Sequence, residues 1–197
     1  TAATCAVRAQ SGDASAVPDE DDKRRFVPAK LKLESGIKEV LLVERRGDQV
    51  MFQFDKKQDV TVGMKVAEIQ AARFELDYDE YKYYRAVAQD QWIEAATILF
   101  DAVVPALPFI DLPHNNIAPL AVEAASRIMK GAAIRRGKLL VDLENNPAKT
   151  EYRAAYNILK ALDDATWFDG VEEARFRAVL CLVMQGRLQE ARDRLET

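Results

Sequence analysis

The sequence predicts an α+β fold, in which a small antiparallel β-module over residues 26–76 precedes an all-α stack of about three helical hairpins over residues 77–197. Before residue 76, apolar residues alternate with polar ones, as in half-buried strands. After residue 77, they recur every three or four positions, as on one face of a helix. The chain has 197 residues and is 49% hydrophobic, which is enough apolar material for a buried core.

Residues 1–25 are predicted to be a targeting-peptide remnant followed by a disordered linker. The small residues Val7 and Ala9 precede Gln10, as they would at a signal-peptidase site. The segment that follows is mostly polar or charged, and it has too little apolar surface to offset the entropy lost on ordering. We therefore expect an exported protein of the periplasm or cell envelope whose mature chain begins near Gln10. A plastid protein is the alternative.

The β-module is predicted from patterns of period two. Val50, Phe52 and Phe54 alternate with less apolar neighbours, and an apolar block at residues 40–43 lies just before a glycine-containing turn. Residues 64–72 fit either a helix or a strand. We expect four or five short strands that form a small twisted sheet or partial barrel. Because so few residues cannot bury a core alone, this sheet should lean on the helices that follow.

Helical periodicity and start signals predict six helices after residue 77. They are expected at residues 78–88, 91–103, 117–136, 148–163, 170–185 and 187–197. Asp77 and Asp169 are each followed three positions later by a glutamate, which is the capping-box pattern, and Asn116 and Asn146 are suited to cap two further helices. Tight turns between successive helices indicate antiparallel hairpins.

One spacing occurs in three of the predicted helices: a large residue, a small residue three positions on, and a large residue four positions further. The sets are Trp92, Ala95 and Leu99; Tyr152, Ala155 and Leu159; and Leu188, Ala191 and Leu195. A small residue between two large ones forms a recess into which a neighbouring helix can pack closely. We therefore expect Ala95, Ala155 and Ala191 to lie at helix–helix contacts.

This spacing resembles the second helix of the tetratricopeptide repeat, a family built from helix–turn–helix units of about 34 residues. The resemblance covers about residues 78–197 and is best at residues 186–191, whose sequence GRLQEA is similar to the family's turn and second-helix start. The equivalent positions 92, 152 and 188 are unevenly spaced, which departs from the family's period. The resemblance implies a helical array that binds partner proteins through a concave surface.

The residues that most often carry catalysis occur here without the neighbours that catalysis needs. His114 is the only histidine and lies between a proline and two asparagines, where a loop or capping role is expected. Cys181 lies among valines and leucines and is expected to be buried and unreactive, while Cys5 would be lost with the targeting peptide. We therefore predict a non-enzymatic protein with no catalytic residues, no cofactor and no metal.

The first candidate binding residues are tyrosines of the first predicted helix. Tyr81 and Tyr84 lie on one face of that helix, whereas Tyr83 lies on another. We expect one face to pack on the next helix and the other to meet the β-module. As the alternative, Tyr78, Tyr81 and Tyr84 form an exposed stripe that binds a partner.

The second candidate is an apolar loop at residues 103–113, which contains three prolines. So many apolar residues would form a large patch if the loop stood free in water. We expect the loop to pack across the hairpins. As the alternative, Leu107, Phe109 and Ile110 bind a partner.

Together these patterns predict a non-catalytic scaffold or adaptor of the bacterial cell envelope that holds a protein partner. The formal net charge is −4 and is spread evenly along the chain, which argues against a nucleic-acid partner. The alternatives are a nucleic-acid-binding small-barrel protein and the non-catalytic part of a larger exported enzyme. The sequence has no run of about 20 apolar residues, the length typical of a membrane span.

Overall fold

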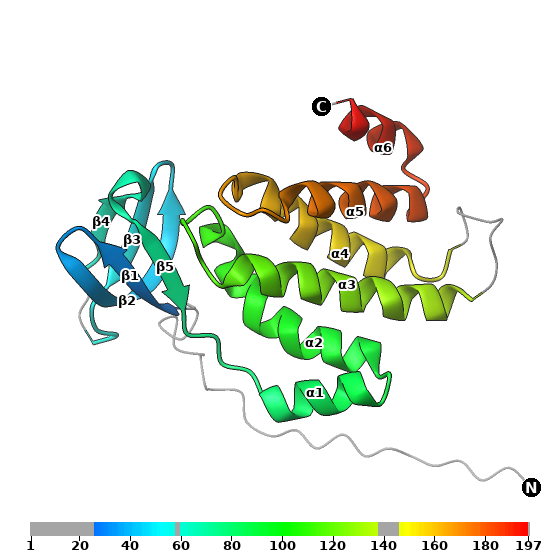
Figure 1. Cartoon of the computed structure of the whole chain (residues 1–197), viewed down its shortest axis with the longest axis horizontal. Coiled ribbons are helices and arrows are strands. Elements are labelled where there is room, and N and C mark those ends of the chain that lie inside the picture. Colours follow the sequence, from blue (N-terminus) through cyan, green and yellow to red (C-terminus); the bar gives the residue numbers. More distant parts are fainter. Residues whose placement is uncertain (1–25, 58–59, 138–145, 197) are drawn as a thin grey trace, which may run out of the picture.

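The computed structural model describes residues 26–57, 60–137 and 146–196. It confirms the predicted fold class, because an antiparallel sheet at one end of the molecule is followed by helices that lie side by side (Figure 1). The predicted linker and the cleavage site near Gln10 fall in residues 1–25 and lie outside the described residues.

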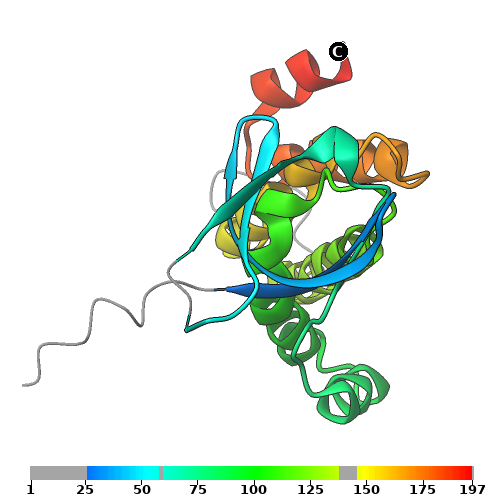
Figure 2. The ribbon, with the colours of Figure 1, turned by 90° about the vertical axis from the view of Figure 1, so that its left-hand side faces the viewer.

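The sheet has five strands in the order β4-β3-β2-β1-β5, and every pairing is antiparallel. The strands are β1 (Val27–Leu33), β2 (Gly36–Arg46), β3 (Gln49–Gln53), β4 (Val62–Lys65) and β5 (Ala71–Phe74). The sheet curls into an open, barrel-like form (Figure 2), and Leu31, Leu42, Val50 and Phe52 are buried inside it. The ambiguous stretch at residues 64–72 forms the end of β4, a 3-10 turn η2 (Val66–Glu68) and the start of β5.

The outer edge of β5 is covered by the segment that leads into α3 (Ile117–Arg136). The Ala72 N–H donates to the Pro113 carbonyl at 3.0 Å. The side chain of Asn116 accepts a hydrogen bond from the Phe74 N–H at 2.7 Å and donates one to the Phe74 carbonyl at 3.0 Å. Asn116 is the N-cap residue of α3, as predicted, but its side chain makes no capping hydrogen bond. The side chain of Asn115 makes the capping hydrogen bonds, since its Oδ1 accepts from the first two amides of the helix.

Six α-helices lie in the described part of the chain, as predicted, with two 3-10 segments between them. In chain order they are α1 (Glu80–Ala88), α2 (Trp92–Val103), η3 (Val104–Phe109), α3, α4 (Lys149–Ala161), η4 (Leu162–Asp164), α5 (Val171–Met184) and α6 (Leu188–Leu195). Each helix packs on the next one along the chain. Ala95, Ala155 and Ala191 are all buried, so the predicted recesses do lie inside the stack.

The predicted capping boxes are wrong in detail. Asp79, not Asp77, caps α1, and its carboxylate accepts from the Lys82 N–H at 2.8 Å. The cap of α5 is Gly170, and no side-chain hydrogen bond is made there. Asn146 does act at the start of α4, where its Oδ1 accepts from the Ala148 N–H at 3.0 Å.

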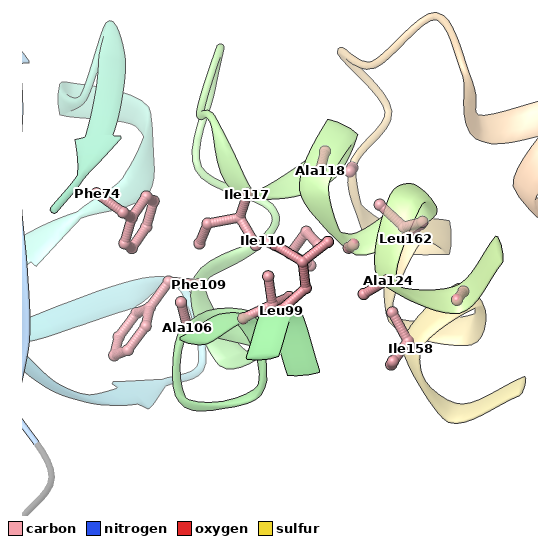
Figure 3. Close-up of a cluster of buried hydrophobic side chains, with 14 of the residues drawn as sticks. Phe74, Leu99, Ala106, Phe109, Ile110, Ile117, Ala118, Ala124, Ile158 and Leu162 are labelled. Atoms are coloured by element: carbon pink, nitrogen blue, oxygen red, sulfur yellow. The ribbon is translucent and has the colours of Figure 1, made fainter. Parts of the chain in front are cut away.

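The sheet and the helices share one buried cluster, which runs from the barrel interior through η3 into the helical stack. Figure 3 shows its middle, where Phe74 of β5 and Phe109 of η3 face each other with ring centroids 6.5 Å apart. The β-module therefore leans on the helices, as the size of its own interior required.

Candidate functional site

The proline-containing loop packs inward and leaves little surface for a partner. It forms η3, and Phe109 and Ile110 are only 2% and 3% exposed. Both side chains point into the shared cluster (Figure 3), so the structure does not present them as binding residues. Leu107 is half-buried and lines a cleft of about 770 Å³ between the β2–β3 turn and η4. The Arg45–Asp111 ion pair crosses this junction.

The tyrosines of α1 divide between the core and the surface. Tyr83 is buried and Tyr78 half-buried, while Tyr81 and Tyr84 are 78% and 62% exposed. The expectation that one face of α1 meets the β-module is wrong, because α1 lies at the lower end of the stack in Figure 1, beyond α2 and apart from the sheet. Tyr81 and Tyr84 therefore remain accessible.

Tyr83 joins α1 to α3 through a polar cluster. Its hydroxyl donates to the Glu123 carboxylate and accepts from Arg127 Nε at 3.3 Å. Burial, reinforced by the hydrogen bond to Glu123, raises the pKa of Tyr83 to about 12. The phenol thus stays neutral and fixes the position of α1 against α3.

An exposed groove between α3 and α5 was not predicted from the sequence. Val122 and Met129 of α3 and Phe176 and Leu180 of α5 line it, and its volume is about 610 Å³. Phe176 is 59% exposed and Leu180 39% exposed. We call this the α3/α5 groove. The sequence held one signal for it, since Phe176 and Leu180 lie one turn apart on the solvent side of an amphipathic helix.

Charged side chains surround the apolar floor of the α3/α5 groove. Arg127 pairs with Glu123 at 2.9 Å on α3, and Arg177 pairs with Glu173 at 2.6 Å on α5. Arg177 also donates to the hydroxyl of Ser126, which connects the two helices.

Lys130 gives the rim an excess of positive charge. Its Nζ lies 4.7 Å from the centre of the Trp92 ring, a cation–π contact. In the described part of the chain no carboxylate pairs with it. The rim thus has three cationic and two anionic side chains.

The structure assigns loop and core positions to the two residues with catalytic potential. His114 lies in a turn with φ of 50°, and its ring packs on Trp167 with centroids 5.8 Å apart. Cys181 is fully buried, which raises the pKa of its thiol to about 12. Among the described residues, no three His, Cys, Asp or Glu side chains come together as metal ligands.

One described segment, Trp92–Phe109, is long and apolar enough to cross a membrane by length and composition, with a mean hydropathy of 1.4. It comprises α2 and η3. Ala95, Leu99 and Val103 of this segment are fully buried, and α2 packs against both α1 and α3. We interpret the segment as a core helix of the stack, since such helices have the same composition.

Comparisons of the chain with protein-family models, curated proteins and solved structures gave no match.

Proposed function

We propose that this protein is a non-catalytic scaffold or adaptor, and that its α3/α5 groove binds a segment of a partner protein. The segment would carry one large apolar side chain flanked by acidic residues. The proposal rests chiefly on the exposed pair Phe176 and Leu180, which lie beside apolar residues of α3 and within a ring of charges. A single exposed apolar residue needs no explanation, but an apolar floor with a charged rim is the usual anatomy of a binding site.

The acidic character of the partner follows from the charges around the groove. Glu123 and Glu173 are already paired with arginines, which leaves Lys130 with its charge directed over Trp92. A carboxylate of the partner would complement this charge.

The tetratricopeptide-like part of the proposal rests on the resemblance in the sequence, and the groove has a place within the predicted hairpins. The groove lies between the first helices of the second and third hairpins, and Arg177 and Ser126 hold these two helices together. Helical arrays of this kind bind partners on the surface formed by successive units. From the pattern around Val7 and Ala9, we further propose that the adaptor works in the bacterial cell envelope.

Selection from a displayed library of random peptides tests the proposal and requires no candidate partner. We expect enrichment of peptides with one large apolar residue next to Asp or Glu. Phe176→Ala should weaken binding of the selected peptides by at least about tenfold, as expected for a central apolar contact. Ile37→Ala is the matched control, because Ile37 is 70% exposed on the sheet, far from the groove. If the selected peptides bind Phe176→Ala as well as the unmodified protein, the α3/α5 groove is not the binding site.

A further inference from the structure

A second groove lies on the opposite side of α3. Its volume is about 290 Å³, and it is lined by residues of three helices: Ile93, Ala96, Thr97 and Phe100 of α2, Ile128 of α3, and Thr150, Glu151 and Ala154 of α4. Ile128 is two positions from both Ser126 and Lys130, so its side chain points away from theirs by about 200° around the helix. The two grooves therefore open on different faces of the stack. We call the second one the α2/α4 groove.

The wall formed by Ile93 is held close to α3 by a glycine. A Cβ at Gly131 would lie 2.2 Å from Ile93 Cδ1, so only glycine leaves room for the present position of this side chain. Ile93 is nevertheless 49% exposed. It is therefore a positioned apolar wall with one side open to solvent.

Among the described residues, Glu151 is the one charged residue that lines the α2/α4 groove. Its Oε1 pairs with Arg135 of α3, while its Oε2 is buried and has no hydrogen-bond partner. A buried acceptor without a donor is unfavourable, because the water that it lost has not been replaced. The terminal torsion of a glutamate is soft, so a small rotation can turn Oε2 toward the groove.

A ligand in the groove should offer Glu151 Oε2 a neutral hydrogen-bond donor and not a second cation. Arg135 already balances the charge of Glu151, so a lysine or arginine placed here would bring one positive charge too many. A leucine or phenylalanine would fill the apolar space but leave Oε2 without a donor. A tyrosine would supply a donor, but its hydroxyl oxygen would then need a donor of its own, and the Thr97 hydroxyl in the groove already donates to the Ile93 carbonyl.

We propose that the α2/α4 groove binds a tryptophan side chain from a segment of another protein. Indole combines a large apolar body with one N–H group that donates and does not accept, which complements a largely apolar groove beside one carboxylate oxygen without a donor. This chain's own tryptophans are held elsewhere, Trp92 beneath Lys130 and Trp167 beside His114. The groove thus provides a second docking point on the face away from the α3/α5 groove.

N-acetyltryptophanamide and its 1-methylindole analogue form a pair of probes that differ by the replacement of the N–H donor with N–CH3. Binding can be followed by NMR through the methyl signals of Ile93 and Ile128, with Ile37 on the sheet as the distant reference. We expect saturable shifts at the first two signals, and about tenfold weaker binding of the methylated probe, because it lacks one hydrogen bond to a charged acceptor. Equal binding of the two probes, or no shift at Ile93 and Ile128, overturns the proposal.

Two variants locate the site in the same titration. Glu151→Gln should weaken binding of N-acetyltryptophanamide while leaving that of the methylated probe unchanged, and Glu172→Gln, an exposed glutamate of α5, is its control. Ala154→Leu should fill the groove and weaken both probes, with the exposed Ala133→Leu as its control. If free indole binds but N-acetyltryptophanamide does not, the groove takes a small molecule and the proposal of a protein segment is wrong. Phe176→Ala should not affect either probe, which separates this test from that of the α3/α5 groove.

Discussion

Cys181 is fully buried, and burial raises the pKa of its thiol from an ordinary 9.0 to about 12. In the unfolded chain the thiol ionises near its ordinary pKa. The stabilisation that is present below pH 9 is therefore lost progressively as the pH rises from about 9 to about 12. The free energy of unfolding falls with rising pH in this range because the fold keeps the thiol neutral.

Replacing Cys181 by Ala removes this contribution to the pH dependence. Between pH 8 and pH 10, we expect the free energy of unfolding to fall by about 1 kcal/mol more for the unmodified protein than for Cys181→Ala. Urea denaturation at the two pH values measures the free energy of unfolding of each protein. If the free energies of unfolding of the two proteins differ by the same amount at pH 8 and pH 10, the thiol is accessible to water.

The side-chain amide of Asn116 makes two hydrogen bonds to the backbone of Phe74, at the edge of β5. A neighbouring strand would make similar bonds there. Asn116→Ala would leave that N–H and carbonyl without these partners. We therefore expect the free energy of unfolding to fall by about 1–3 kcal/mol in chemical denaturation. Asn157→Ala, on an exposed position of α4, is the control and should change stability by less than about 0.5 kcal/mol. Similar effects of the two changes would contradict the role given to Asn116.

Cap residues show what local sequence patterns leave undetermined at this scale. Asp77 and Asp79 both have side chains suited to capping, and only Asp77 has the glutamate spacing of a capping box. The helix nevertheless begins after Asp79, since the chain is still extended there. Tyr78, just before the helix, packs edge-to-face on Tyr83 within it, and such packing is not encoded in the capping pattern.

At the scale of helices, the sequence predicted both ends of every helix to within two residues. Period and propensity are local properties, so they can be read without knowing the fold. The buried position of Ala95, Ala155 and Ala191 was predicted for the same reason. A small residue on the apolar stripe of a helix indicates a close contact, whichever helix makes it.

The two grooves could not be predicted in this way, because each depends on helices that are not neighbours in the chain. Phe176 of α5 and Val122 of α3 line one groove, and Ala154 of α4 and Ala96 of α2 line the other. No spacing within a single helix determines these distances. A reader of the sequence could find Phe176 as an apolar residue on a charged face, but not the residues opposite it.

Replacing a recess alanine by leucine tests the close contacts directly. Ala95→Leu and Ala155→Leu each add bulk at a position with 0% exposure, so we expect each to lower the free energy of unfolding by about 1–3 kcal/mol. Ala191→Leu should cost less, because its buried cluster is small and separate from the main one. Thermal denaturation compares the three with Ala133→Leu, whose site is exposed. If Ala95→Leu and Ala155→Leu have the same melting temperature as the control, the helices do not pack closely at these residues.

At the scale of the whole molecule, the sheet and the helical stack depend on each other. Among the contacts that connect them are the Phe74–Phe109 ring pair, the Asn116 hydrogen bonds and the Arg45–Asp111 ion pair. The sequence predicted that the β-module leans on the helices from its size alone. It did not show that η3 is the connecting segment, because three prolines gave no regular pattern to interpret.

The Phe109 ring belongs to the core of both parts, so its loss should weaken both together. Phe109→Ala would leave a cavity between η3 and β5, and we expect the free energy of unfolding to fall by about 3–5 kcal/mol. Because one buried cluster runs through the sheet and the stack, amides in β1 and in α4 should exchange faster with solvent by the same factor. Hydrogen exchange followed by mass spectrometry measures both segments in one sample. Phe54→Ala, at a half-exposed ring on the sheet, controls for loss of an aromatic side chain. Faster exchange in β1 with no change in α4 would show that the sheet unfolds alone and that the shared cluster does not make the two parts one cooperative unit.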